Sequence, residues 1–142
     1  KRTENMASQA KAFIKEMQCQ VTFEEFSSLF YLTVPTHAHW GHLLFMLMRM
    51  EGIHIQHNRA NFLTTEHCEE DVKKILHAFK KALSELISHG LLEGNMVAAK
   101  RFLTGNKEIP KGARLGKNAQ GEPAYFIEDS NRKGKYIEVG KA

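Results

Sequence analysis

The segment 29–34 limits the possible folds most, because an extended chain there is apolar on both faces. Alternate residues of a strand point to opposite sides, and here only Thr33 is polar. Such a strand is typical of the centre of a sheet that is covered on both sides. We therefore predict a central strand that ends at Pro35 and follows a first extended segment around Val21 and Phe23. The two faces consist of Phe30, Leu32 and Val34, and of Leu29, Tyr31 and Thr33.

Three segments show helical spacing of apolar residues. Residues 2–17 predict a first helix, and a further short helix is expected over 95–103. Residues 69–89 begin with acidic residues, which suits a helix N-terminus, and Gly90 is placed to end that helix. The predicted core-facing residues are Ala7, Ala10, Phe13, Ile14 and Met17 in the first helix, and Val72, Ile75, Leu76, Phe79, Leu83 and Leu86 in the long one.

A fourth helix is predicted over about 37–50. Thr36 is placed to cap its N-terminus, and Gly52 is a natural residue to follow its C-terminus. The expected buried stripe of this helix is Trp40, Leu43, Leu44, Met46, Leu47 and Met50.

Short extended segments connect these helices. "IHI" at 53–55 and "ANFLTT" at 60–65 predict two short strands, and "QHNR" between them predicts a turn. The resulting order of helix, strand pair, helix, strand pair and helix indicates an α+β fold, in which helices cover a small sheet.

The composition changes after Thr104, where glycine, lysine and asparagine become frequent. We interpret this part as a basic linker, with "AYFIE" and "KYIEVG" pairing as a β-hairpin. The predicted domains are therefore 1–92, and a tail of 93–142 with a short helix and the hairpin. Residues 96–142 carry 10 Lys/Arg against 5 Asp/Glu, a net charge of +5. The tail lacks an aromatic stacking pattern, so nucleic acid is not its expected partner.

Several classes of protein are excluded by simple features. No run of 18 apolar residues exists, so no membrane span is expected, and the N-terminus lacks the apolar core of a secretory signal. Cys19 and Cys68 form no CxxC motif, and free thiols indicate the cytoplasm. The absence of a starting Met indicates a piece of a longer chain.

Three histidines, His37, His39 and His42, lie close together beside Trp40. A metal site needs three or four converging ligands, and no acidic residue lies between 36 and 50. Packing at the start of a helix is the favoured interpretation, although a metal site stays open at this stage. His67 lies where a strand end meets a helix start, which predicts a local hydrogen bond there.

Three pieces of the chain resemble the C-terminal small domain of class III pyridoxal-phosphate (PLP) aminotransferases, and most closely the glutamate-1-semialdehyde aminomutase-like group. The first is a strand of the type S-[LM]-F, here residues 28–30. The second is the helix end at residues 51–55. The third, and the most specific, is a segment of the type F-[LV]-S-x-x-H-[ST]-x-E-D-[IV], here residues 62–72.

The resemblance implies one part of an enzyme. Aminotransferase domains embedded in polyketide and nonribosomal peptide megasynthases aminate a β-ketoacyl chain held on a carrier protein. The family's Schiff-base lysine lies in a large PLP-binding domain, upstream of the matching region. The resemblance thus implies PLP bound by that domain, a homodimer mate, an acyl carrier protein as partner, and no activity of this chain alone. It places Arg59 and Ser28 near the substrate or cofactor, and gives Thr64 and His67 local structural roles.

Three departures from the family patterns are informative. Cys68 replaces the usual Ser or Thr after the histidine, which predicts a helix start weaker by roughly 1 kcal/mol. Arg59 stands where the aminomutases have an acid, as in the megasynthase domains. It either meets a phosphate or carboxylate, or is a surface residue of a turn. Asn61 stands where ornithine-type enzymes carry a substrate-binding arginine.

The alternative function is a non-catalytic α+β binding module, whose basic tail docks a protein or nucleic acid. An uncovered apolar sheet face, around Leu29 and Tyr31 or around Phe30 and Leu32, would favour the enzyme part. Such faces normally meet another domain.

Overall fold

The structure is a computed structural model that describes residues 1–57, 59–105, 114–121, 123–128 and 136–141. The chain forms two compact units, Lys1–Lys100 and Arg101–Ala142, and each is described by itself. The first unit is α+β, as the sequence predicts. The prediction of a functional domain over 1–92 stays a prediction.

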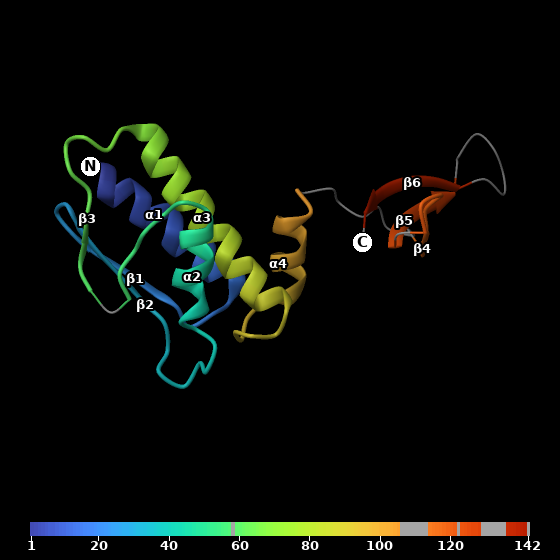
Figure 1. The fold of residues 1–142 in the computed structure, drawn as a ribbon, viewed down its shortest axis with the longest axis horizontal. Coiled ribbons are helices and arrows are strands. Elements are labelled where there is room, and N and C mark those ends of the chain that lie inside the picture. Colours follow the sequence, from blue (N-terminus) through green and yellow to red (C-terminus); the bar gives the residue numbers. More distant parts are fainter. Residues whose placement is uncertain (58, 106–113, 122, 129–135, 142) are drawn as a thin grey trace. The chain divides into compact units, whose positions relative to one another are not determined.

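The first unit contains one three-stranded antiparallel sheet (Figure 1). Its strands are β1 (Thr22–Phe26), β2 (Leu29–Thr33) and β3 (Asn61–Phe62). The order β1-β2-β3 confirms that β2 is the central strand. β3 confirms the second of the two predicted short strands, although it is shorter than 60–65.

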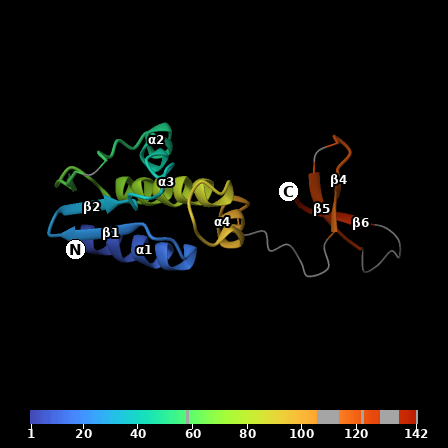
Figure 2. The same ribbon diagram turned by 90° about the horizontal axis from the view of Figure 1, so that it is seen from below.

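Four helices accompany this sheet: α1 (Arg2–Met17), α2 (Leu43–Met50), α3 (Glu69–Ser88) and α4 (Met96–Leu103). α1 packs against β1 and α3, and α2 packs against α3 (Figures 1 and 2). Three of the four predicted helices are confirmed within one or two residues. Their clear periodicity and their end signals explain this agreement.

The core lies between one face of the sheet and the helices α1 and α3. Phe23 stacks on Phe30 with ring centroids 5.4 Å apart, and its ring meets Phe79 of α3 edge-on at 6.2 Å. The inner face of β2 is therefore covered, as predicted. The largest fully buried side chains are Phe79, Met6, Met17, Leu32, Leu44, Met48, Leu83, Leu86 and Ile87.

Glycines end both α2 and α3 in the same way. Gly52 has a φ of +81°. Its N–H donates to Arg49 O at 2.9 Å, and the next N–H, of Ile53, donates to Met48 O at 3.0 Å. This pair of bonds satisfies the last carbonyls of α2 and is known as a Schellman motif. Gly90, with a φ of +70°, ends α3 by the equivalent bonds.

The predicted start of the helix at 37–50 is wrong. Thr36 does not cap it, because residues 36–42 form successive tight turns and the helix begins at Leu43. The N–H of Gly41 donates to Ala38 O at 2.9 Å, and the following turns repeat this short spacing. A side chain on Gly41 would collide with Val34 and Ala38, so the turns pack tightly against the end of β2.

The predicted buried stripe of this helix is also largely wrong. Of its members only Leu44 is buried, while Trp40, Met46 and Met50 are exposed. The buried residues of α2 are Leu44, Phe45 and Met48.

Residues 53–55 are not a strand in the structure, which contradicts the prediction. Their alternation survives, because Ile55 is buried and His54 is exposed.

The second unit contains a three-stranded antiparallel sheet with the order β4-β5-β6. Its strands are β4 (Arg114–Lys117), β5 (Pro123–Glu128) and β6 (Tyr136–Lys141). The predicted hairpin is confirmed as β5 and β6. The interpretation of residues 114–117 as linker is wrong, since they pair with β5. The rest of the predicted linker, residues 106–113, lies outside the described residues.

Candidate functional site

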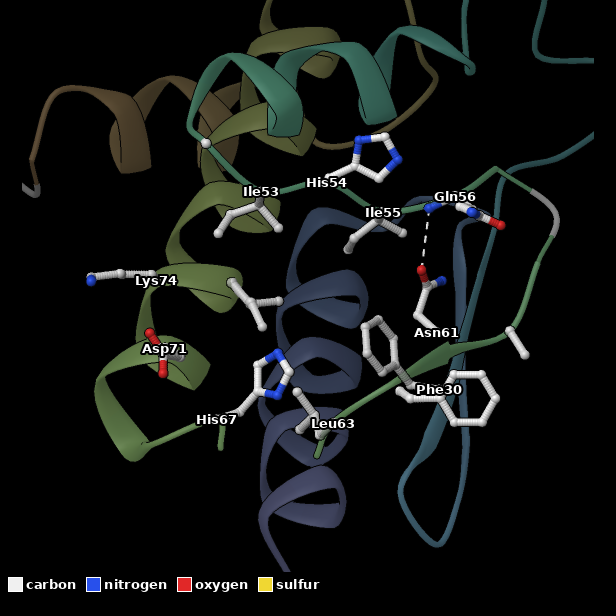
Figure 3. Close-up of a pocket in the computed structure, with 14 residues that line it drawn as sticks. Phe30, Ile53, His54, Ile55, Gln56, Asn61, Leu63, His67, Asp71 and Lys74 are labelled. Atoms are coloured by element: carbon white, nitrogen blue, oxygen red, sulfur yellow. Dashed lines mark hydrogen bonds between the residues drawn. The ribbon is translucent and has the colours of Figure 1, made fainter. Parts of the chain in front are cut away.

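A cavity of about 600 Å³ lies in the first unit, between α3, β3 and the segment that follows α2 (Figure 3). This volume falls within the range of small-molecule sites. Its lining residues include Phe30, Ile53, Ile55, Leu63, His67, Asp71 and Ile75.

The segment 53–56 forms one wall of the cavity. All four of its residues line the cavity, and the side chains of Ile53 and Ile55 point into it (Figure 3). Asn61 ties the end of this segment to the start of β3, because its side-chain oxygen accepts a bond from Gln56 N–H at 3.2 Å. Its side-chain nitrogen donates to Arg59 O at 3.0 Å. The wall is thus an extended segment with an apolar inner side.

His67 stands on the opposite side of the cavity, in the turn before α3 (Figure 3). The backbone N–H of Thr64 donates to His67 Nδ1 at 3.0 Å, and the hydroxyl oxygen of Thr64 lies 2.9 Å from the same nitrogen. The guanidinium of Arg2 donates to the carbonyl of His67 at 2.8 Å. The ring is therefore held by Thr64 in the segment that follows β3, while Arg2 of α1 anchors the backbone of His67.

Asp71 organises the start of α3. Its Oδ2 accepts bonds from Cys68 N–H at 2.9 Å and from the Cys68 thiol at 3.1 Å. Hydrogen bonds to a carboxylate favour its ionised form, so the bonds from Cys68 hold the pKa of Asp71 below its usual value. Asp71, the third residue of the helix, thus satisfies the backbone N–H of Cys68, which is the carboxylate half of a capping box. The predicted weakening of the helix start stays a prediction.

The structure brings two of the four sequence-predicted site residues together. Thr64 and His67 form the local hydrogen bond that the sequence predicts between the strand end and the helix start. Ser28 and Arg59 are exposed and do not line the cavity. Ser28 contributes its carbonyl, which accepts a bond from Leu63 N–H at 2.9 Å.

Sequence reasoning missed the cavity walls. The alternation of Ile53 and Ile55 with polar neighbours was the available signal, and it was interpreted as a strand. Asp71 was recognised only as part of an acidic helix start.

The histidine cluster does not form a metal site. Within the described residues no group of three His, Cys, Asp or Glu side chains is placed to hold a metal ion. His39 instead packs edge-on against Trp40, with ring centroids 4.7 Å apart. All three histidines are nevertheless exposed, so the prediction that they pack at the start of a helix is wrong.

The cavity does not fit covalently bound PLP. Among the described residues that line it, Lys74 is the one lysine; it is exposed on α3 and points away from the cavity (Figure 3). A lysine that forms a Schiff base is activated by burial or a cationic neighbour, and Lys74 lies beside Asp71 instead. No step of PLP chemistry is therefore assigned to these residues.

The outer face of the sheet carries an apolar row that crosses all three strands. Phe26 pairs with Leu29 in the register of β1 and β2, and Leu29 pairs with Phe62 in the register of β2 and β3. Phe26 is 78% exposed and Phe62 is 59% exposed, while Leu29 and Tyr31 are half-exposed. We call Phe26, Leu29, Tyr31 and Phe62 the outer apolar face. Within the described residues, the prediction that β2 is covered on both sides holds for its inner face alone.

Comparisons with protein-family models, with curated protein sequences and with solved structures found no match to this chain. Among the described residues, no helix has the length and apolar character needed to cross a membrane.

Proposed function

We propose that the first unit is the C-terminal lobe of a class III PLP-dependent aminotransferase embedded in a polyketide or nonribosomal peptide megasynthase. In this proposal an upstream large domain binds PLP and supplies the Schiff-base lysine. The lobe closes over that site, and the enzyme aminates a β-ketoacyl chain held on an acyl carrier protein. A homodimer and a cytoplasmic location belong to the same proposal.

The outer apolar face is the observation that carries this proposal. A sheet whose inner face is buried by α1 and α3 leaves two phenylalanine rings in water on the other side. Contiguous exposed apolar side chains usually mark a surface that another domain or subunit covers.

The conformation of residues 62–72 gives further support. This segment carries the most specific part of the resemblance, and it runs from strand β3 through the Thr64–His67 hydrogen bond into α3. The bonds between Cys68 and Asp71 then fix the first turn of the helix. The residue types that the motif specifies thus make contacts with one another.

Arg59 keeps both of its interpretations. Its side chain is exposed in the turn before β3, so it is free to meet a phosphate or carboxylate of another domain. Replacing Arg59 with Ala in the complete enzyme distinguishes these roles. If Arg59 contacts the substrate, losing that contact raises KM; if it is a surface residue, KM stays unchanged.

The test uses the longest native polypeptide that contains this segment. That polypeptide is incubated with PLP, a ¹⁵N-labelled amino donor and a carrier protein loaded with a β-ketoacyl chain. We expect ¹⁵N in the acyl chain by mass spectrometry, and no transfer when the 142-residue chain is used alone. Absence of label with a polypeptide that includes the upstream region would contradict the proposal.

One observation favours the binding module as a second candidate. Residues 101–142 carry 9 Lys/Arg against 5 Asp/Glu, and they contain a three-stranded sheet, which has one strand more than the predicted hairpin. Retention of the chain on immobilised nucleic acid, lost steeply between low and moderate salt, would support this function. Salt-independent or absent retention would exclude it.

A further inference from the structure

The cavity between segment 53–56 and α3 has a defined polar atom, the Nε2 of His67. A backbone N–H can only donate, so the bond from Thr64 N–H requires an acceptor at His67 Nδ1. Nδ1 therefore carries no hydrogen, and in this neutral ring the hydrogen lies on Nε2. The fold thus selects one tautomer of the imidazole and makes Nε2 a donor.

Within the described part of the chain, this donor has no hydrogen-bond acceptor. The ring is half-buried and lines the cavity. The nearby acid, Asp71, directs its Oδ2 to the backbone and thiol of Cys68. Because the ring is only half-buried and this N–H is open to solvent, a ligand with an acceptor atom would replace solvent there.

The remaining lining is mixed, with His54, Gln56, Asn61, Asp71 and Lys74 beside an apolar part that suits an apolar ligand body. Ile53 and Ile55 face the cavity from one side, and Leu63, just after β3, and Ile75, on α3, also line it. The charged amine of Lys74 points away from it (Figure 3). Neutral donors suit a carbonyl oxygen better than they suit a carboxylate, which prefers a cationic partner. An apolar chain that ends in a neutral carbonyl matches both features.

We propose that this cavity binds a linear acyl chain, and that the carbonyl oxygen of its thioester accepts a hydrogen bond from His67 Nε2. The proposal rests on the proposed function, because it identifies the place where this lobe would hold part of the carrier-bound acyl substrate. His67 acts there in binding and positioning, while the chemistry belongs to the upstream domain.

The test is an NMR titration of the full 142-residue chain with octanoyl-N-acetylcysteamine, a soluble acyl thioester. Long-range ¹H–¹⁵N spectra first report the tautomer of His67, for which we expect the hydrogen on Nε2. On titration we expect shifts of the His67 ring and of the methyl groups of Ile53, Ile55 and Ile75. N-acetylcysteamine without the acyl chain should cause none of these shifts.

Two variants and one control test the assignment. His67→Phe keeps a ring of similar shape but removes the donor, and should weaken binding by about fivefold, which is the usual effect of one hydrogen bond. Ile75→Trp fills the cavity and should abolish binding, whether or not the His67 variant keeps its local structure. His77→Gln is the matched control, because His77 is an exposed histidine of α3 that does not line this cavity, so its loss should leave binding unchanged.

Three results would overturn the proposal. They are a His67 tautomer with the hydrogen on Nδ1, thioester shifts that persist in Ile75→Trp, and octanoate binding that is tighter than thioester binding. The last result would show that the site prefers a free carboxylate.

The titration contains no PLP, so its outcome is separate from the transamination test. Binding by a polypeptide that fails to transaminate leaves the acyl site standing, and transamination without binding removes the acyl site alone.

Discussion

Ser27 has a φ of +57° at the two-residue turn between β1 and β2. This left-handed region suits glycine, and a side chain there is disfavoured. Ser28, the next residue, has no such conformation. The turn therefore contains one strained position beside an unstrained one of the same residue type.

We expect opposite effects when these serines become glycine. Ser27→Gly relieves the strain and should raise the free energy of unfolding by about 0.5–1 kcal/mol, whereas Ser28→Gly should lower it by a similar amount. Urea unfolding followed by fluorescence of Trp40 reports on the first unit, since Trp40 is the sole tryptophan of the chain. Equal effects of the two substitutions would contradict the assigned turn.

Asp71 links stability to pH. Its folded pKa lies below the unfolded value, so its contribution is present above about pH 4 and is lost as the pH falls through the folded pKa. We expect Asp71→Asn to destabilise the chain at pH 7, and this difference to shrink in acid. Urea unfolding at several pH values measures it.

The control for Asp71 is Glu66→Gln. Glu66 is exposed, and the described part of the chain gives it no hydrogen-bond partner. Its replacement should change the pH profile little, and an equal effect of both substitutions would remove the special role of Asp71.

At the scale of residues, sequence reasoning recovers local contacts and misses distant ones. The bond between Thr64 and His67 joins positions three apart, so a motif can predict it. Ile53 and Ile75 line the same cavity although they are far apart in the sequence. Residue spacing along the chain does not predict that they come close together.

At the scale of elements, α2 shows the limit of periodicity. Seven of its eight residues are apolar, so the pattern does not identify which side is buried. β4 was missed for another reason: its central residue, Gly116, is typical of loops. A side chain on Gly116 would approach the Phe126 ring to 2.9 Å, so the strand needs glycine for packing.

Gly94 fixes the position of α4 against the rest of the first unit. The next residue, Asn95, donates its N–H to Met17 O at 2.6 Å, and its side chain accepts a bond from Ala98 N–H at 3.1 Å. A Cβ at Gly94 would lie 2.8 Å from Met17 O and 2.8 Å from Ile87 Cδ1. The chain therefore passes too close to α1 and α3 for any larger residue.

We expect Gly94→Ala to lower the free energy of unfolding by roughly 1–3 kcal/mol, because the backbone oxygen of Met17 has little room to move. Urea unfolding measures this effect. Glu93→Ala, at the exposed neighbouring position, should change stability by less than about 0.5 kcal/mol. If Gly94→Ala were equally neutral, the close packing of this segment would be disproved.

At the scale of the whole molecule, the apolar pattern of segment 29–34 gave the earliest indication of a covered sheet. The structure contains the cover for one face and leaves the other face open within the described residues. The inner cover could be predicted because α1 and α3 show their apolar sides in the sequence. No sequence pattern of this chain identifies what covers the outer apolar face. Its cover by another domain is therefore a proposal.

The outer apolar face should behave as an exposed patch in the isolated chain. Replacing Phe26 and Phe62 together with Ser should reduce binding of the dye ANS and reduce self-association in sedimentation velocity. Val97→Ser is the control, because Val97 is 79% exposed but lies on α4, away from this face. Unchanged ANS binding in the double variant would show that Phe26 and Phe62 do not form an exposed apolar surface that binds the dye.

The central claim is that this chain is one lobe of a PLP enzyme. The most direct measurement is the absorbance spectrum of the longest native polypeptide that contains it, with and without added PLP. We expect a yellow absorbance band of protein-bound PLP that an amino donor bleaches. No band, in a polypeptide shown to include the whole upstream region, would contradict the account and favour the binding module.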